Sequence, residues 1–97
     1  MTETGIRTVV LEEIKNIARK YGVKKVLLFG SRARGDFHKT SDIDLAVSGG
    51  NKAMFQLDVE EKTSTLLMFD VVDLDAKIQK ELRESINQEG IIIYEEV

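Results

Sequence analysis

Two aspartates at the start of an apolar run are the residues whose type and spacing most directly suggest chemistry. They are Asp42 and Asp44 in "SDIDLAV". Because side chains alternate faces along a strand, the two carboxylates point the same way and Ile43 and Leu45 point the other way. Neighbouring carboxylates repel unless a cation lies between them, and Mg²⁺ is usually held by one or two protein carboxylates plus substrate phosphates. The spacing indicates a divalent-cation site, with a solvated strand face as the alternative.

A glycine-containing turn upstream, "FGSRARG" over 29–35, favours the first interpretation. Gly30 and Ser31 stand where an apolar strand ends and a short helical turn begins. Backbone N–H groups there, with the serine hydroxyl, form a cradle suited to phosphate, and Gly30 and Gly35 allow a ligand to approach the backbone closely. For phosphates and metal to meet, the end of the first strand must lie beside the start of the second. These two strands should therefore be antiparallel.

Asp70 in "MFDVVDL" is the best candidate for a third carboxylate. It lies near the start of a third strand, and a helix over about 52–66 separates that strand from the second. A strand–helix–strand crossover makes the two strands parallel, so their first residues adjoin and Asp70 comes to lie beside Asp42 and Asp44. Asp73 is the rival candidate, but at three residues further on it points to the opposite face.

Polar residues around the turn and the second strand are secondary candidates for binding a nucleotide. Arg34, next to Gly35, and Arg32 could neutralise triphosphate charge; the alternative for both is a solvated turn or a surface ion pair. Ser41 could shape the start of the strand, support a carboxylate or contact the nucleotide. Asp36 is more consistent with a turn or cap than with a fourth ligand.

Apolar periodicity and turn residues predict the elements that must position these groups. We expect a helix from about Ile6 that ends at Tyr21-Gly22, and another that Asp75 caps and Gly90 closes. We expect strands over 24–30, 42–48, 67–74 and 91–96. The result is an α/β (α+β) domain with a small mixed sheet flanked by helices: the first two strands antiparallel, the second and third parallel.

Length and composition restrict the classes of function. The 97 residues fit one domain over 1–97, and with no cysteine the chain has neither disulfides nor thiolate metal sites. A net charge of −3 argues against broad nucleic-acid binding. Since no apolar run approaches about 18 residues, we expect a cytoplasmic protein with no membrane partner. So small a catalytic domain leaves little surface for a substrate lobe, which favours a partner protein.

The compound pattern "GSRARG…SDIDLAV", with "FDVVDL" downstream, resembles the DNA polymerase β-like nucleotidyltransferases and, within them, the minimal nucleotidyltransferases (MNT). That family's pattern is G-S, a short turn ending in glycine, S-D-x-D-L and a later strand aspartate. The similarity extends over essentially the whole chain. It implies transfer of a nucleotidyl group, usually AMP from ATP, to an acceptor hydroxyl with release of pyrophosphate.

The resemblance also implies roles for individual residues. Gly30 and Ser31 would hold the β- and γ-phosphates. Asp42 and Asp44 would bind both of two Mg²⁺ ions. Asp70 would bind the ion that carries the acceptor oxygen and would help to take its proton.

Members of the MNT group are commonly encoded beside a HEPN-domain toxin and act as its antitoxin by transferring AMP to a tyrosine of that ribonuclease. The resemblance therefore implies a HEPN toxin as partner and protein adenylyltransferase activity. Two alternatives stay open. One is an antitoxin that acts by contact alone, and the other is a small-molecule nucleotidyltransferase of the aminoglycoside-modifying kind.

Overall fold

The computed structural model describes residues 3–96 of the chain. Helices and strands follow one another in the predicted order, with a single turn of helix after the first strand. In chain order they are α1 (Thr8–Lys20), β1 (Lys25–Phe29), α2 (Ser31–Arg34), β2 (Ile43–Ser48), α3 (Lys52–Lys62), β3 (Phe69–Asp73), α4 (Lys80–Glu89) and β4 (Ile91–Glu95).

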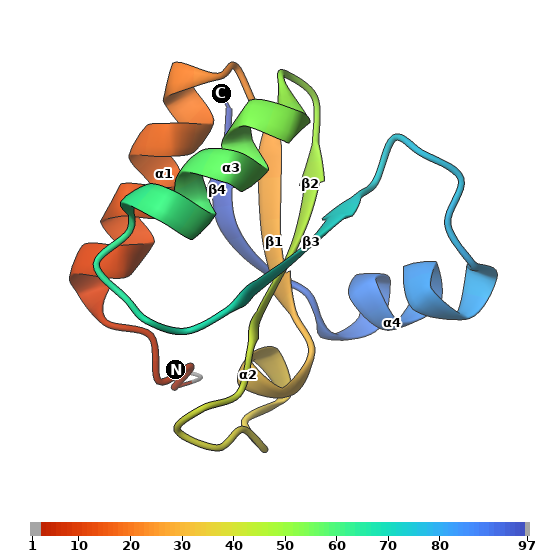
Figure 1. Ribbon diagram of the computed structural model, residues 1–97. Coiled ribbons are helices and arrows are strands. Elements are labelled where there is room, and N and C mark those ends of the chain that lie inside the picture. The colour runs from red at the N-terminus through yellow and green to blue at the C-terminus, as the bar shows by residue number, and fades with distance from the viewer. Residues whose placement is uncertain (1–2, 97) are drawn as a thin grey trace.

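The four strands form one mixed sheet in the order β3-β2-β1-β4. β1 pairs antiparallel with β2 and with β4, whereas β2 and β3 are parallel. The predicted fold class and both predicted strand relations are confirmed. The turn between β1 and β2 and the start of β3 consequently lie at the same end of the sheet (Figure 1).

Alternation along the strands divides the core between the two faces of the sheet. α1 and α3 lie on one face and α4 on the other (Figure 1). Leu45 of β2 belongs to the first cluster, whereas Ala46 packs with Phe29 and with Ile86 of α4 in the second. Asp44 lies two residues before Ala46 on the same strand, so its side chain points to the same face of the sheet, which α4 covers.

α1 ends in a Schellman motif, as the predicted glycine stop requires. Gly22 has φ +69°, its N–H donates to Arg19, and the Val23 N–H donates to the Ala18 carbonyl at 2.9 Å. A left-handed residue at this position is usually glycine because it carries no Cβ.

Two predicted helix boundaries are wrong, and in both cases a distant partner holds the residue concerned. α3 ends at Lys62 instead of near 66, because the chain turns extended at Thr63 and the Ser64 N–H and hydroxyl donate to Glu13 of α1. Asp75 does not cap α4, which begins at Lys80. Its carboxylate instead accepts hydrogen bonds from the Gly49 N–H and from Lys52.

Within residues 3–96, no helix combines the length and the apolar character that crossing a membrane requires.

Candidate active site

The starts of two parallel strands bring two of the three predicted carboxylates together. Asp44 and Asp70 are direct partners in the β2–β3 register, and Asp44 also lies opposite Phe29, the last residue of β1. The crossover rule thus gave the correct neighbour for Asp44. Asp42 lies just before β2 and is exposed.

Gly30 is the point where the glycine turn after β1 and the carboxylate of Asp44 meet. Its φ of +77° lies in the region that favours glycine, and a Cβ built on it would lie 2.1 Å from Oδ2 of Asp44. The carboxylate is therefore packed against the glycine backbone, and no side chain fits between them. The antiparallel pairing of β1 and β2 predicted that the turn would lie close to the carboxylates, and it does.

The carboxyl group of Asp44 is held in an environment that opposes its ionisation. Burial, and then the charges of Asp70 and Asp42, raise its pKa from 3.8 to about 6, with Glu89 adding to the rise and Arg34 opposing it. Clustered carboxylates with this signature gain most from a cation, because a positive charge removes both the desolvation cost and the mutual repulsion.

Asp73, the rival third carboxylate, lies at the opposite end of β3. It is the register partner of Val47, accepts the Asp75 N–H at 2.9 Å and lies 3.6 Å from the Lys52 ammonium. The structure therefore leaves Asp70 as the β3 carboxylate beside Asp44.

Arg34 and Glu89 form a contact that links the turn to the end of α4. Nη1 of Arg34 is 3.2 Å from both carboxylate oxygens of Glu89, and its Nε donates to Asp36 at 3.3 Å. Oε1 of Glu89 also accepts the Gly30 N–H at 2.9 Å. Arg34 thus makes the surface ion pair that was the alternative to a nucleotide contact, and the nucleotide contact stays a prediction.

Glu89 is the site residue that the sequence prediction missed. A signal for it existed, because an acidic residue in the last turn of a helix opposes the helix dipole and therefore needs another reason to be there.

Arg32 is buried within the fold, so the alternative of a solvated turn or a surface ion pair is wrong for this residue. Its side chain is 1% exposed, and its guanidinium donates to the carbonyls of Thr4, His38, Lys39 and Ser41 and lies over the ring of Phe37. Its hydrogen bonds hold the loop that precedes Asp42 in place.

The two serines occupy different surroundings. Ser31 is the first residue of α2, directly after Gly30, and its carbonyl accepts the N–H groups of Gly35 and Asp36. The Ser41 hydroxyl accepts the His38 N–H at 2.8 Å, so it shapes the loop before β2.

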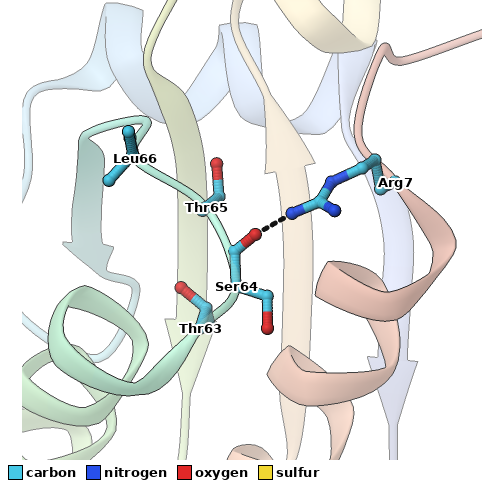
Figure 2. A pocket seen from close by; sticks show the side chains of 5 residues that line it. All are labelled: Arg7, Thr63, Ser64, Thr65 and Leu66. Carbon is cyan, nitrogen blue, oxygen red and sulfur yellow. Dashed lines mark hydrogen bonds between the residues drawn. The ribbon is translucent and has the colours of Figure 1, made fainter.

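The described residues contain no group of three His, Asp or Glu side chains gathered closely enough to hold a metal ion by themselves. The hollow drawn in Figure 2 also lies apart from the carboxylates. It is lined by Arg7 and residues 63–66, and Arg7 donates there to the Ser64 carbonyl. None of its lining residues is a carboxylate, so it lacks the negative charge that the aspartates at the strand starts would offer a cation.

Three comparisons place this arrangement among known proteins. The family model "Polymerase beta, Nucleotidyltransferase" matches residues 12–97. The Methanocaldococcus jannaschii protein named "Putative protein adenylyltransferase MJ0604" is 30% identical over 96 residues, which cover 88% of this chain and 94% of that protein.

Solved structures agree with the fold. A crystal structure of a toxin–antitoxin with AMP-PNP matches with a TM-score of 0.70 at 23% identity, over 89% of this chain and 73% of that one. A structure of a mutant of the toxin–antitoxin MntA-HpeT matches with a TM-score of 0.66 at 25% identity, over 88% and 72% of the two chains. With its sheet, its glycine turn and its paired aspartates in the arrangement that the resemblance required, the chain belongs to the polymerase β nucleotidyltransferase family and is a nucleotidyltransferase enzyme.

Proposed function

We propose that the protein transfers AMP from ATP to a hydroxyl of a partner protein and acts as the antitoxin of that partner, most simply on a tyrosine of a HEPN-domain toxin. The observation that carries the proposal is the adjacency of Gly30, Asp44 and Asp70, which sets the glycine turn, suited to phosphate, against paired carboxylates. The archaeal relative's name supports a protein as acceptor, and the toxin–antitoxin structures support an antitoxin role.

Asp42, Asp44 and Asp70 are the residues that would hold Mg²⁺, two ions in all, together with oxygens of the triphosphate. Their oxygen ligands suit this hard cation, and the raised pKa of Asp44 is the effect expected of carboxylates assembled without one. When bound, Mg²⁺ ions neutralise charge on the attacking and leaving oxygens of an in-line displacement.

The phosphates would lie against the turn between β1 and α2. The Gly30 N–H already binds an anionic oxygen, that of Glu89, and the Arg34 guanidinium binds the same carboxylate. Both donors therefore point at a position where an anion is stable. Ser31 would contribute its hydroxyl, and Ser41 would act through the loop that carries Asp42.

The reaction is a substitution at the α-phosphorus. The acceptor oxygen forms a bond to that phosphorus, the bond to the oxygen shared with the β-phosphate breaks, and pyrophosphate leaves. Asp70 takes the proton of the acceptor hydroxyl. Positioning of the two substrates and neutralisation of their charge supply most of the rate, because no covalent intermediate is needed.

The test is transfer from ATP radiolabelled at the α-phosphate, in Mg²⁺, with the lysate of the source organism or a purified HEPN partner as acceptor. We expect a labelled protein band with the wild-type enzyme and with Asp73→Asn, and none with Asp44→Asn. Pyrophosphate release without a labelled protein would indicate a small-molecule acceptor. Neutralisation of the toxin that survives Asp44→Asn would indicate an antitoxin that acts by contact alone.

A further inference from the structure

The carboxylate of Glu89 occupies the donors that the proposed function assigns to the triphosphate. It accepts the Gly30 N–H at 2.9 Å, and both of its oxygens lie 3.2 Å from Nη1 of Arg34. The side chain is 19% exposed, so it lies in the site and not in solvent. A planar anion held by one backbone N–H and one guanidinium is the arrangement in which a phosphate group would bind.

The position of Glu89 is unfavourable apart from these two bonds. It is the last residue of α4, where the helix dipole disfavours a negative charge. It also lies near Asp44, another carboxylate, so like charges face one another across the turn. Its bonds to Gly30 and Arg34 are what offset these costs, and both bonds are lost if a phosphate takes the same donors.

The end of α4 does not have to move for Glu89 to leave. α4 is anchored to the sheet through Ile86, which packs with Phe29 and Ala46, and Leu82 packs against the same cluster. Glu89 reaches the turn with a long, flexible side chain, so a rotation of that side chain releases Gly30 while the helix stays packed.

We propose that Glu89 competes with the nucleoside triphosphate for the same donors. Its carboxylate binds Gly30 and Arg34 in the nucleotide-free enzyme and is displaced when the phosphates bind. The inference rests on the proposed function, because it requires that the triphosphate use these two donors. Glu89 then sets the nucleotide affinity. The observed dissociation constant equals the intrinsic one divided by the fraction of molecules in which Glu89 has left the turn.

The proposal predicts opposite effects of one substitution on stability and on binding. Glu89→Gln keeps the shape of the side chain and removes its charge, and Glu89→Ala removes the competitor. Without nucleotide, both variants should melt at a lower temperature than wild type, because Glu89→Gln weakens the bonds to the turn and Glu89→Ala removes them. Both should bind α,β-methylene-ATP, which the transfer reaction does not cleave, about five- to tenfold more tightly.

Glu84→Gln is the matched control. It makes the same change of charge on the same helix, at an exposed residue 3.9 Å from Lys80, and it should change neither property. Binding is measured by titration calorimetry in Mg²⁺, with inorganic tripolyphosphate as a second probe, because competition at the phosphates must strengthen the binding of both ligands.

Unchanged or weaker binding of both ligands by the two Glu89 variants would overturn the inference and indicate that Glu89 orients Arg34 for the nucleotide. Tighter binding of the nucleotide alone would also overturn it, because the gain would not arise at the phosphates. If wild type and all variants bound neither ligand, the proposed function would fail together with the inference.

Discussion

The two ends of β3 carry the same residue type in opposite surroundings. Asp73 accepts a backbone N–H and lies 3.6 Å from the ammonium of Lys52. Asp70, three residues earlier, has the carboxylate Asp44 as its register partner. One strand thus holds a carboxylate that the fold itself satisfies and another that it sets beside a like charge.

The same contrast separates the two ends of the sheet. At the end away from the proposed site, the hydrogen bond from Tyr21 lowers the pKa of the buried Asp58, and Lys62 and Lys20 lower it further. Asp75 has its pKa lowered by the Gly49 N–H and then by Lys52. At the other end, the pKa of Asp44 is raised.

The carboxylates that stabilise the fold differ in their partners from those that we propose to bind a ligand. A carboxylate that stabilises the fold has donors and cations supplied by the chain. A carboxylate beside other carboxylates, as Asp44 is, lacks such partners, and a cation that bound there would supply one. The residue type is the same in both groups, and only the neighbouring residues distinguish them.

The largest effect on the rate of AMP transfer should be the difference between two variants, each with one aspartate replaced by asparagine, at opposite ends of the sheet. We expect Asp44→Asn to lower the rate of AMP transfer by at least about a hundred- to thousandfold, because a preorganised charge at the reacting centre is lost. Asp73→Asn should stay within about twofold of wild type, since its partners lie outside the site. Initial rates with α-labelled ATP measure both. Equal losses in the two variants would show that both act through the fold.

The arrangement of Asp44 and Asp70 was predictable from sequence because it depends on rules of topology. Alternation sets the face of Asp44, and the crossover through α3 makes β2 and β3 parallel, so residues at the starts of these strands become neighbours. Gly30 was predictable for a similar reason, because a strand that ends in a tight turn beside a ligand needs a residue without a Cβ.

Contacts between distant segments were not predictable in this way. The burial of Arg32 depends on carbonyls of the loop over 38–41 and of Thr4, and nothing in its local sequence distinguishes it from Arg34. Asp75 follows a strand as a helix cap would, yet Gly49 and Lys52 hold its carboxylate. Glu89 lies 59 residues from Gly30. Such pairs are determined by three-dimensional packing, on which local propensity gives no information.

A smaller loss of activity should follow from filling the space between turn and carboxylate. Gly30→Ala places a Cβ where Oδ2 of Asp44 now lies, so we expect the transfer rate to fall by about a hundredfold as the carboxylate is displaced. Gly22→Ala is the matched control, because Gly22 also has positive φ but has no atom within 4 Å of the added Cβ. It should cost on the order of 1 kcal/mol of stability and leave activity unchanged. Equal rates in the two variants would contradict the close packing at Gly30.

The smallest effects should appear in the pH dependence of stability, measured without metal or nucleotide. Because the pKa of Asp44 in the folded protein is about 6 instead of 3.8, the folded state binds more protons than the unfolded state between these values. Its contribution to stability therefore falls as pH rises from about 4 to above 6. Asp44→Asn removes that fall. We expect it to raise Tm by about 4–8 °C at pH 7.5, the shift that roughly 1 kcal/mol produces at this size, and to leave Tm nearly unchanged at pH 4.

Asp75→Asn should have the opposite sign, because the Gly49 N–H and Lys52 hold the pKa of Asp75 below 3.8. Its stabilising contribution is present above the pKa of the unfolded chain and is lost as pH falls through the lower pKa of the folded protein. The variant should therefore melt slightly below wild type at pH 7.5, and the difference should vanish in acid. Thermal melts of both variants across this range in EDTA give the two curves. Curves of the same sign would mean that the two ends of the sheet do not differ in how they hold their carboxylates, and the distinction drawn between Asp44 and Asp75 would lose its electrostatic basis.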